Sequence, residues 1–91
     1  MVRKRDRLEV IRDILKIVVK NKNAIVPTRL LRNSNLSTKR FSEYYAELLK
    51  KGFVREIQDK DNKKLITLTD KGFNYLEKYN TIINFINEFE L

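Results

Sequence analysis

The sequence contains neither cysteine nor histidine among its 91 residues. Without cysteine the chain forms no disulfide and no thiolate metal site. Without histidine it lacks the commonest general base and the commonest transition-metal ligand. The Asp and Glu residues are also not clustered in a way that would form a carboxylate site. We therefore expect a protein that is not an enzyme and needs no metal or cofactor.

Long apolar runs are missing as well. No stretch approaches the roughly 18 residues of a membrane span. The charged start, residues 1–7, is followed by Glu9, Arg12 and Asp13, which interrupt any apolar core of a signal peptide. We expect a cytoplasmic, nucleoid-associated protein without a membrane partner.

Positive charge is abundant and unevenly placed. The formal net charge is +8, and residues 1–64 hold 18 Lys and Arg against 8 Asp and Glu, whereas residues 65–91 hold 2 against 4. A basic body with a slightly acidic tail suggests a polyanionic partner for the body and a different role for the tail. The alternative is that the lysines only keep a small protein soluble.

The spacing of apolar residues predicts the order of the elements in the first half. Steps of three and four from Leu8 predict a helix over residues 6–20. An apolar, β-branched stretch stopped by Pro27 predicts a very short edge strand, and Pro27 suits the start of the next helix. After a turn, Ser37 is a good N-cap for a helix that runs to Lys51 and is followed by Gly52 as its left-handed C-cap residue.

The second half predicts a hairpin and a long helix. Period-two alternation from Phe53 to Ile57 and from Lys64 to Leu68, separated by a polar turn, indicates two strands with a charged tip. Thr69 and Asp70 then cap a helix that extends to Glu90. This helix carries an apolar stripe at the spacing of a coiled-coil seam, for which we expect a dimerisation role. Its residues are Tyr75, Tyr79, Ile82, Ile83, Ile86 and Phe89.

The predicted elements follow in the order helix, short strand, two helices, hairpin and long helix. This order is the layout of a winged helix-turn-helix, an α+β fold that is mostly helical. We expect a basic N-terminal arm at residues 1–7, a DNA-binding domain at residues 8–69 and a dimerisation helix at residues 70–91.

Three segments carry a resemblance to a known family. They are Leu36-Ser37-Thr38-Lys39-Arg40-Phe41, then residues 44–54, and Ile66-Thr67-Leu68-Thr69-Asp70-Lys71-Gly72. In this the chain resembles small archaeal winged-helix DNA-binding proteins, with the Lys-Gly endings also common in MarR-like and PadR-like regulators. The resemblance implies double-stranded DNA as partner and a homodimer paired through an antiparallel coiled coil. Phe85 and Phe89 depart from the aliphatic residues usual near the end of that helix.

The helix over residues 37–51 is the candidate reading helix, because the second helix of such a motif enters the major groove. With Phe41 and Tyr45 facing the core, the outward residues of its first two turns are the candidates for contact with base edges. They are Thr38, Lys39, Arg40, Ser42 and Glu43. The alternative for Lys39 and Glu43, four residues apart, is a surface ion pair with no role in binding.

Further residues are candidates for contact with the DNA backbone. The turn residues Asp59, Asp61 and Asn62 are explained by turn chemistry alone, and Ser37 by capping. A solvated tail is an equal alternative for the arm, which otherwise contacts phosphates or the minor groove. The backbone candidates are Arg29, Arg32, Ser37, Lys60, Lys63 and Lys64, with Arg3, Lys4 and Arg5 in the arm.

The tyrosine pairs Tyr44 and Tyr45, and Tyr75 and Tyr79, could stack on bases, but helical spacing favours packing in the core or a dimer interface. The function most favoured is transcription regulation by a DNA-binding homodimer. The alternatives are a chromatin-type binder without sequence preference and a protein-interaction adaptor, because function does not follow from fold.

Overall fold

A computed structural model describes residues 6–91 of the chain. Within this range the elements are α1 (Arg7–Lys20), α2 (Pro27–Ser34), α3 (Thr38–Lys50), β1 (Val54–Gln58), β2 (Lys64–Leu68) and α4 (Asp70–Glu88). The order and type of these elements confirm the predicted winged helix-turn-helix fold. The expected arm residues Arg3, Lys4 and Arg5 lie outside the described residues.

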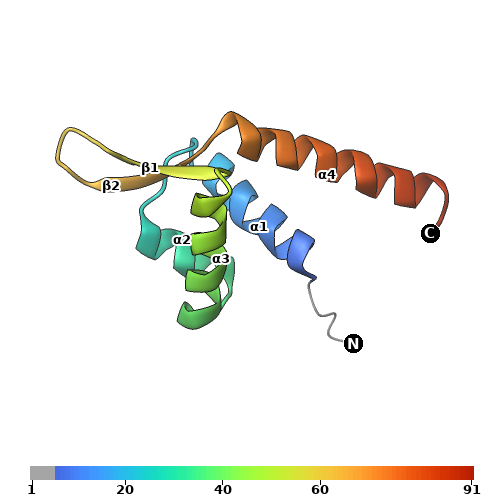
Figure 1. The fold of residues 1–91 in the computed structure, drawn as a ribbon, viewed down its shortest axis with the longest axis horizontal. Coiled ribbons are helices and arrows are strands. Elements are labelled where there is room, and N and C mark those ends of the chain that lie inside the picture. The colour runs from blue at the N-terminus through green and yellow to red at the C-terminus, as the bar shows by residue number, and fades with distance from the viewer. Residues whose placement is uncertain (1–5) are drawn as a thin grey trace.

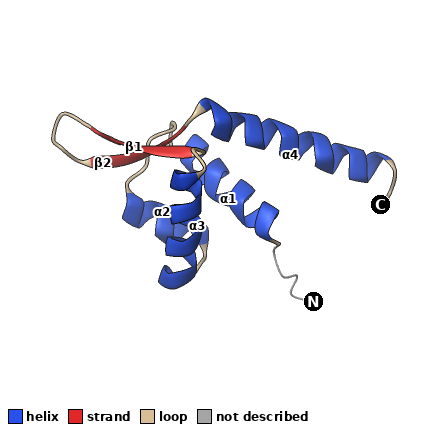
Figure 2. Cartoon of the chain, in the orientation of Figure 1, coloured by secondary structure: helices blue, strands red, loops and turns tan. Residues whose placement is uncertain are grey.

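Helices α1 to α3 pack together beneath the hairpin of β1 and β2, and the hairpin and α4 project in opposite directions (Figure 1). Most of the regular structure is helical (Figure 2). The two projections give the molecule its longest extent, 49 Å, against 29 and 22 Å in the other directions. None of the described helices is long and apolar enough to cross a membrane.

Local capping fixes where the helices begin and end. Asp6, Ser37 and Thr69 each accept a hydrogen bond from the backbone N–H three residues ahead, at 2.8, 3.2 and 3.2 Å. Such bonds satisfy amides that the first helical turn leaves without a partner. Helix α3 ends at Lys50, and Gly52 follows it after Lys51 with a φ of 75°, the left-handed conformation that glycine adopts at little cost.

The sheet is smaller than the sequence pattern suggested. Strands β1 and β2 pair antiparallel from Val54 opposite Leu68 to Gln58 opposite Lys64. The expected edge strand at residues 24–26 is reduced to one bridge, in which Ile25 and Ile66 exchange hydrogen bonds of 3.2 and 2.8 Å. Because Pro27 starts α2 two residues later, the chain leaves the sheet before a second pair can form.

The core is built around one face of α1. Five residues of this helix are buried, and α2, α3 and the base of the hairpin cover them. At about 25 cal/mol per Å² of apolar surface removed from water, burial of this cluster is the main stabilising contribution. The buried apolar residues of the described chain are Val10, Ile11, Ile14, Leu15, Val18, Ile25, Leu30, Phe41, Leu48, Val54, Ile66 and Leu68.

Helix α4 contacts the body with only its first half. The Tyr75 hydroxyl donates to the Leu8 carbonyl at 2.8 Å, and the Arg12 guanidinium lies 5.0 Å from the centre of the Tyr79 ring. Farther along, Ile82 is 52% exposed, Phe85 54% and Phe89 57%. The stripe predicted as a dimer seam is therefore half-covered by α1 within one chain and otherwise open to solvent.

The start of α4 is joined to the end of α3 by a close backbone contact at Gly72. The Lys71 ammonium donates to the Lys51 carbonyl at 2.7 Å, and the Thr69 N–H donates to the Phe53 carbonyl at 3.1 Å. A Cβ atom on Gly72 would lie 2.3 Å from the Phe53 carbonyl oxygen, which is backbone and cannot move aside cheaply. This position therefore requires glycine for space rather than for an unusual φ.

Replacing Gly72 by alanine should force α4 away from Phe53. We expect Gly72→Ala to lower the free energy of unfolding by about 1–3 kcal/mol, the usual cost of overpacking. The free energy of unfolding is measured by urea unfolding monitored by circular dichroism. Asn74→Ala, at an exposed position of the same helix, is the matched control. Equal stability of the two variants would contradict the close contact.

Candidate nucleic-acid interface

The outward side of α3 is polar and carries unpaired cations. Thr38, Lys39, Arg40, Ser42 and Glu43 are all exposed, as predicted from the inward positions of Phe41 and Leu48. Although Lys39 and Glu43 are four residues apart on one helix, no ion pair joins them within residues 6–91. Both side chains are therefore free to meet a partner.

Arg40 is held loosely by an aromatic ring. Its guanidinium lies 5.9 Å from the centre of the Tyr44 ring, a cation–π arrangement on the following turn of α3. The two residues border a hollow of about 260 Å³ between α3 and the start of α1, which Arg7, Glu43 and Glu47 also line. The guanidinium keeps all its N–H donors available, because a π face does not consume them as a carboxylate does.

The hairpin carries its cations toward the tip. Lys60 and Lys63 are exposed and, within the described chain, form no ion pair, whereas Lys64 lies 3.7 Å from the Glu56 carboxylate. Asp59 closes the turn, because its carboxylate accepts from the N–H groups of Asp61 and Lys63, each at 2.9 Å. The turn interpretation of Asp59 is confirmed.

A hydrogen bond ties the hairpin to α3. The Tyr45 hydroxyl donates to the Glu56 carboxylate at 2.5 Å, and the Tyr45 ring stacks on Phe41 with 5.7 Å between centres. Burial raises the pKa of the Tyr45 phenol, and the Glu56 hydrogen bond and charge raise it further. The phenol therefore remains a donor across the physiological pH range, and the bond persists.

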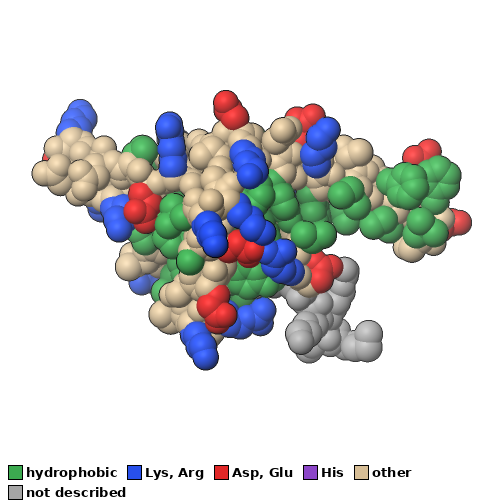
Figure 3. Space-filling model, viewed as in Figure 1, with side chains coloured by type: hydrophobic (Ala, Val, Ile, Leu, Met, Phe, Trp, Pro, Cys, Tyr) green, Lys and Arg blue, Asp and Glu red, His purple; other side chains and the backbone are tan. Residues whose placement is uncertain are grey.

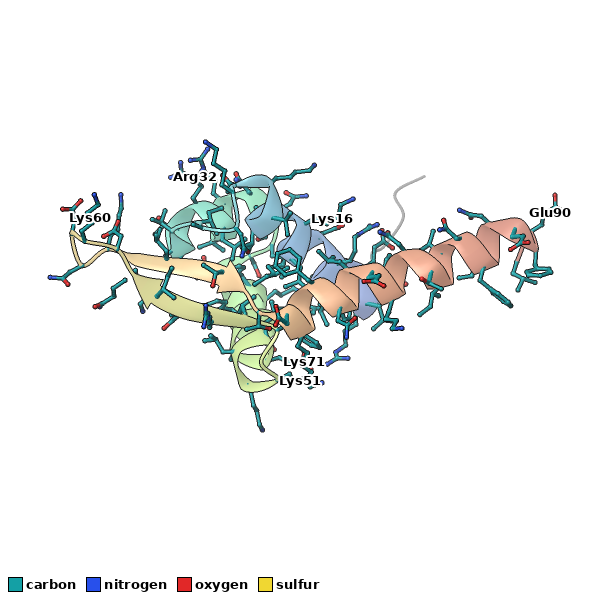
Figure 4. All side chains as sticks on the ribbon, turned by 90° about the horizontal axis from the view of Figure 1, so that it is seen from above. Lys16, Arg32, Lys51, Lys60, Lys71 and Glu90 are labelled. Atoms are coloured by element: carbon teal, nitrogen blue, oxygen red, sulfur yellow. The ribbon has the colours of Figure 1, made fainter. Side chains whose placement is uncertain are left out.

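Helix α2 places its two arginines outside the core. Arg29 and Arg32 are exposed, while Leu30 is fully buried beneath them. Arg32 and Lys16 lie on the side of the molecule opposite Lys51 and Lys71 (Figure 4). Ser37 caps α3 through its hydroxyl, which confirms the capping interpretation and leaves its contact with phosphate a prediction.

Sequence reasoning missed two residues of this surface. Arg55 on β1 is exposed, opposite Thr67, and has no ion-pair partner among residues 6–91. The alternation of Arg55 with the buried Val54 along the strand could have indicated that the Arg55 side chain is exposed. Glu47 accepts ion pairs from Lys51 at 2.9 Å and from Arg7 on α1. No periodic signal in the sequence reveals the Arg7 pair, because its members are on different helices.

In the part of the chain that the structure describes, no group of three or more acidic, cysteine or histidine side chains is placed to hold a metal ion. Two carboxylates near α3 are occupied within the chain, Glu47 by two cations and Glu56 by Tyr45 and Lys64, whereas Glu43 has no ion-pair partner among residues 6–91. What remains outward on α3 and the hairpin is mostly cationic. Such a surface attracts a polyanion.

Comparison with known proteins gives a family and two similar structures. Residues 4–87 match the family described as winged helix-turn-helix. Sso10a-2, a DNA-binding protein from Sulfolobus solfataricus, has a TM-score of 0.73 at 19% identity, over 94% of this chain and 86% of that chain. A winged-helix DNA-binding protein from STIV has a TM-score of 0.70 at 23% identity, over 88% and 91%. At these identities the structural likeness shows a shared fold. No curated protein matches the sequence.

The Tyr45 hydrogen bond should be visible in the alkaline stability of the protein. A phenol whose pKa is raised on folding stabilises the fold below its unfolded pKa, here 10.0, and loses that contribution as pH rises further. We expect Tyr45→Phe to unfold more easily at pH 7 by about 0.5–1.5 kcal/mol. It should also lose less stability than the parent above pH 10.0. Urea titrations at neutral and alkaline pH test both statements. If Tyr45→Phe and the parent lost the same free energy of unfolding as pH rises into the alkaline range, the assignment of this hydrogen bond would be refuted.

Proposed function

Because this chain belongs to the winged helix-turn-helix family, we propose that it binds double-stranded DNA as a homodimer and regulates transcription. Helix α3 would lie in the major groove with its first two turns at the base edges, and the hairpin would contact the backbone beside it. The observation that carries this proposal is the exposure of Lys39 and Arg40 on α3 and of Lys60 and Lys63 near the hairpin tip, none of which forms an ion pair within residues 6–91. The proposed place of action is the cytoplasm, at the nucleoid.

The roles of individual residues follow from donor geometry. Arg40 and Lys39 can donate to the acceptor atoms of guanine, and Glu43 can accept from the amine of cytosine. Arg29 and Arg32 on α2, and Lys60 and Lys63 on the hairpin, are suited to phosphates. Arg55 joins this backbone group because it is exposed on the same hairpin. The two structurally similar proteins are themselves described as DNA-binding, which supports the choice of ligand.

Neither catalysis nor a cofactor is part of this proposal. Binding of the phosphate backbone releases counterions, so affinity should fall steeply with salt for a regulator and for a general chromatin-type binder alike. The two are separated by discrimination between sequences, which depends on side chains at base edges. An adaptor that binds only proteins would show neither property.

The DNA-binding proposal is tested by fluorescence anisotropy with selected and random duplexes over a salt series. We expect Arg40→Ala to weaken binding to the selected duplex by about 1–3 kcal/mol and to reduce discrimination. Lys60→Ala should weaken binding to both duplexes and lower the salt slope by about one.

Lys78→Ala is the matched control, because it removes one exposed positive charge from α4, outside all the proposed DNA contacts. Its affinity should stay close to that of the parent. Equal losses of affinity in Lys78→Ala and Arg40→Ala would refute reading through α3. Absence of binding by the parent at physiological salt would overturn the DNA proposal altogether.

The homodimer is supported by the open half of α4, since an apolar stripe of this length in water favours association. We expect the parent to sediment as a dimer and Ile82→Glu to sediment as a monomer, because a charge would be buried in the seam. Asn84→Glu adds the same charge at another exposed position of α4 and should remain dimeric. Sedimentation velocity measures the oligomeric state of all three proteins. A monomeric parent protein would contradict the proposal.

A further inference from the structure

The end of α3, the start of β1 and the start of α4 are joined at one place. The Thr69 hydroxyl donates to the Gly52 carbonyl at 2.5 Å, and the Lys71 ammonium donates to the Lys51 carbonyl at 2.7 Å. Beside these bonds, Arg55 of β1 and Lys71 of α4 line the same surface hollow, of about 380 Å³. The hydrogen bonds to the backbone therefore hold side chains of three elements in a fixed relation.

Three exposed cations lie at this junction, and we call Lys51, Arg55 and Lys71 the hairpin-base cluster. Arg55 has no ion-pair partner among residues 6–91, and Lys51 shares the Glu47 carboxylate with Arg7. The Lys71 ammonium has three N–H donors and uses one on a neutral carbonyl. Lys and Arg side chains gather on this face where the body meets the hairpin and α4 (Figure 3). The cluster thus offers charge and free donors to an anion.

The carboxylates near the cluster do not cancel its charge. Residues 47–56 and 64–71 together hold five Lys and Arg against three Asp and Glu. Two of these acids, Glu47 and Glu56, are already engaged by other side chains of the chain. The third, Asp70, lines the hollow beside two cations. The surface is therefore cationic after every neighbouring acid is counted.

The reading helix carries Arg40 and Lys51 on one side. Arg40, Glu47 and Lys51 are separated by seven and four residues, a spacing that keeps them in one stripe of an α-helix. At about 1.5 Å per residue, Lys51 lies roughly 16 Å along the axis from Arg40. The major groove is only about 12 Å wide. With the first two turns of α3 at the base edges, the last turn therefore lies at the edge of the groove, where the phosphates are.

We propose that Lys51, Arg55 and Lys71 bind the phosphate backbone of the duplex at the edge of the groove that α3 reads. This inference rests on the proposed DNA binding and extends it to α4, whose first turn then contacts DNA directly. Because the three cations are held by hydrogen bonds within the chain, little order is lost when they bind. Phosphates carry no sequence information, so the cluster contributes affinity and orientation but no discrimination.

The proposal is tested by anisotropy titrations of Arg55→Gln and Lys71→Gln against the selected and random duplexes over a salt series. Glutamine removes the charge and keeps N–H donors, and urea unfolding checks that each variant is as stable as the parent. Each variant should lower the salt slope by about 0.9, the contribution of one phosphate contact. Both duplexes should lose the same factor in affinity, so that their ratio stays that of the parent.

Lys78→Gln is the matched control, because it removes an exposed lysine from the same helix two turns beyond Lys71. Its salt slope should equal that of the parent. An equal fall in Lys78→Gln would reveal a general effect of net charge and overturn the cluster.

Methylphosphonate groups, placed one at a time in the selected duplex, locate the contact. At phosphates outside the base pairs that Arg40 reads, this neutral group should weaken binding of the parent and leave the Arg55→Gln/Lys71→Gln double variant unaffected. Unchanged slopes in Arg55→Gln and Lys71→Gln, together with lost affinity in Arg40→Ala, would overturn the cluster and leave DNA binding intact. Absence of binding by the parent at physiological salt would overturn both.

Discussion

Burial of one face of α1 is the interaction on which the rest of the structure depends. Val10, Ile14 and Val18 are almost completely buried, and α2, the base of the hairpin and the first half of α4 all contact α1. Helix α2 has only eight residues, too few to be stable alone, and α4 gains its direction from Tyr75 and Tyr79. Without this common partner, α2, the hairpin and α4 would have no fixed positions relative to one another.

The same packing decides which charges remain outside. Once α1 and α3 are adjacent, Glu47 lies within reach of Arg7 and Lys51, and once the hairpin covers α3, Glu56 receives the Tyr45 hydroxyl. Glu47 and Glu56 are therefore partly neutralised by their own chain. This arrangement leaves the excess positive charge on α3 and the hairpin, where it can act on a polyanion.

The sequence predicted the features that depend on neighbours along the chain. The caps at Ser37 and Thr69, the glycine after α3 and the outward side of α3 follow from local chemistry and the helical period, and the structure confirms them. It could not predict contacts between distant segments. Three such contacts depend on how the elements cross: Tyr45 with Glu56, Arg7 with Glu47, and Tyr75 with Leu8. The spacing of residues along one helix contains no information on the angle at which it crosses another element.

The stripe on α4 shows where pattern and structure carry different information. Its regular spacing from Tyr75 to Phe89 describes one continuous seam, yet the first half is partly covered by α1 and the second half is open. Spacing specifies that a helix face needs an apolar partner, but it does not specify which one. The exposed half of this stripe is what supports the proposed homodimer, because it is the part of the seam that α1 does not cover. In such a dimer, the distance between the two copies of α3 would follow from the way α4 leaves α1.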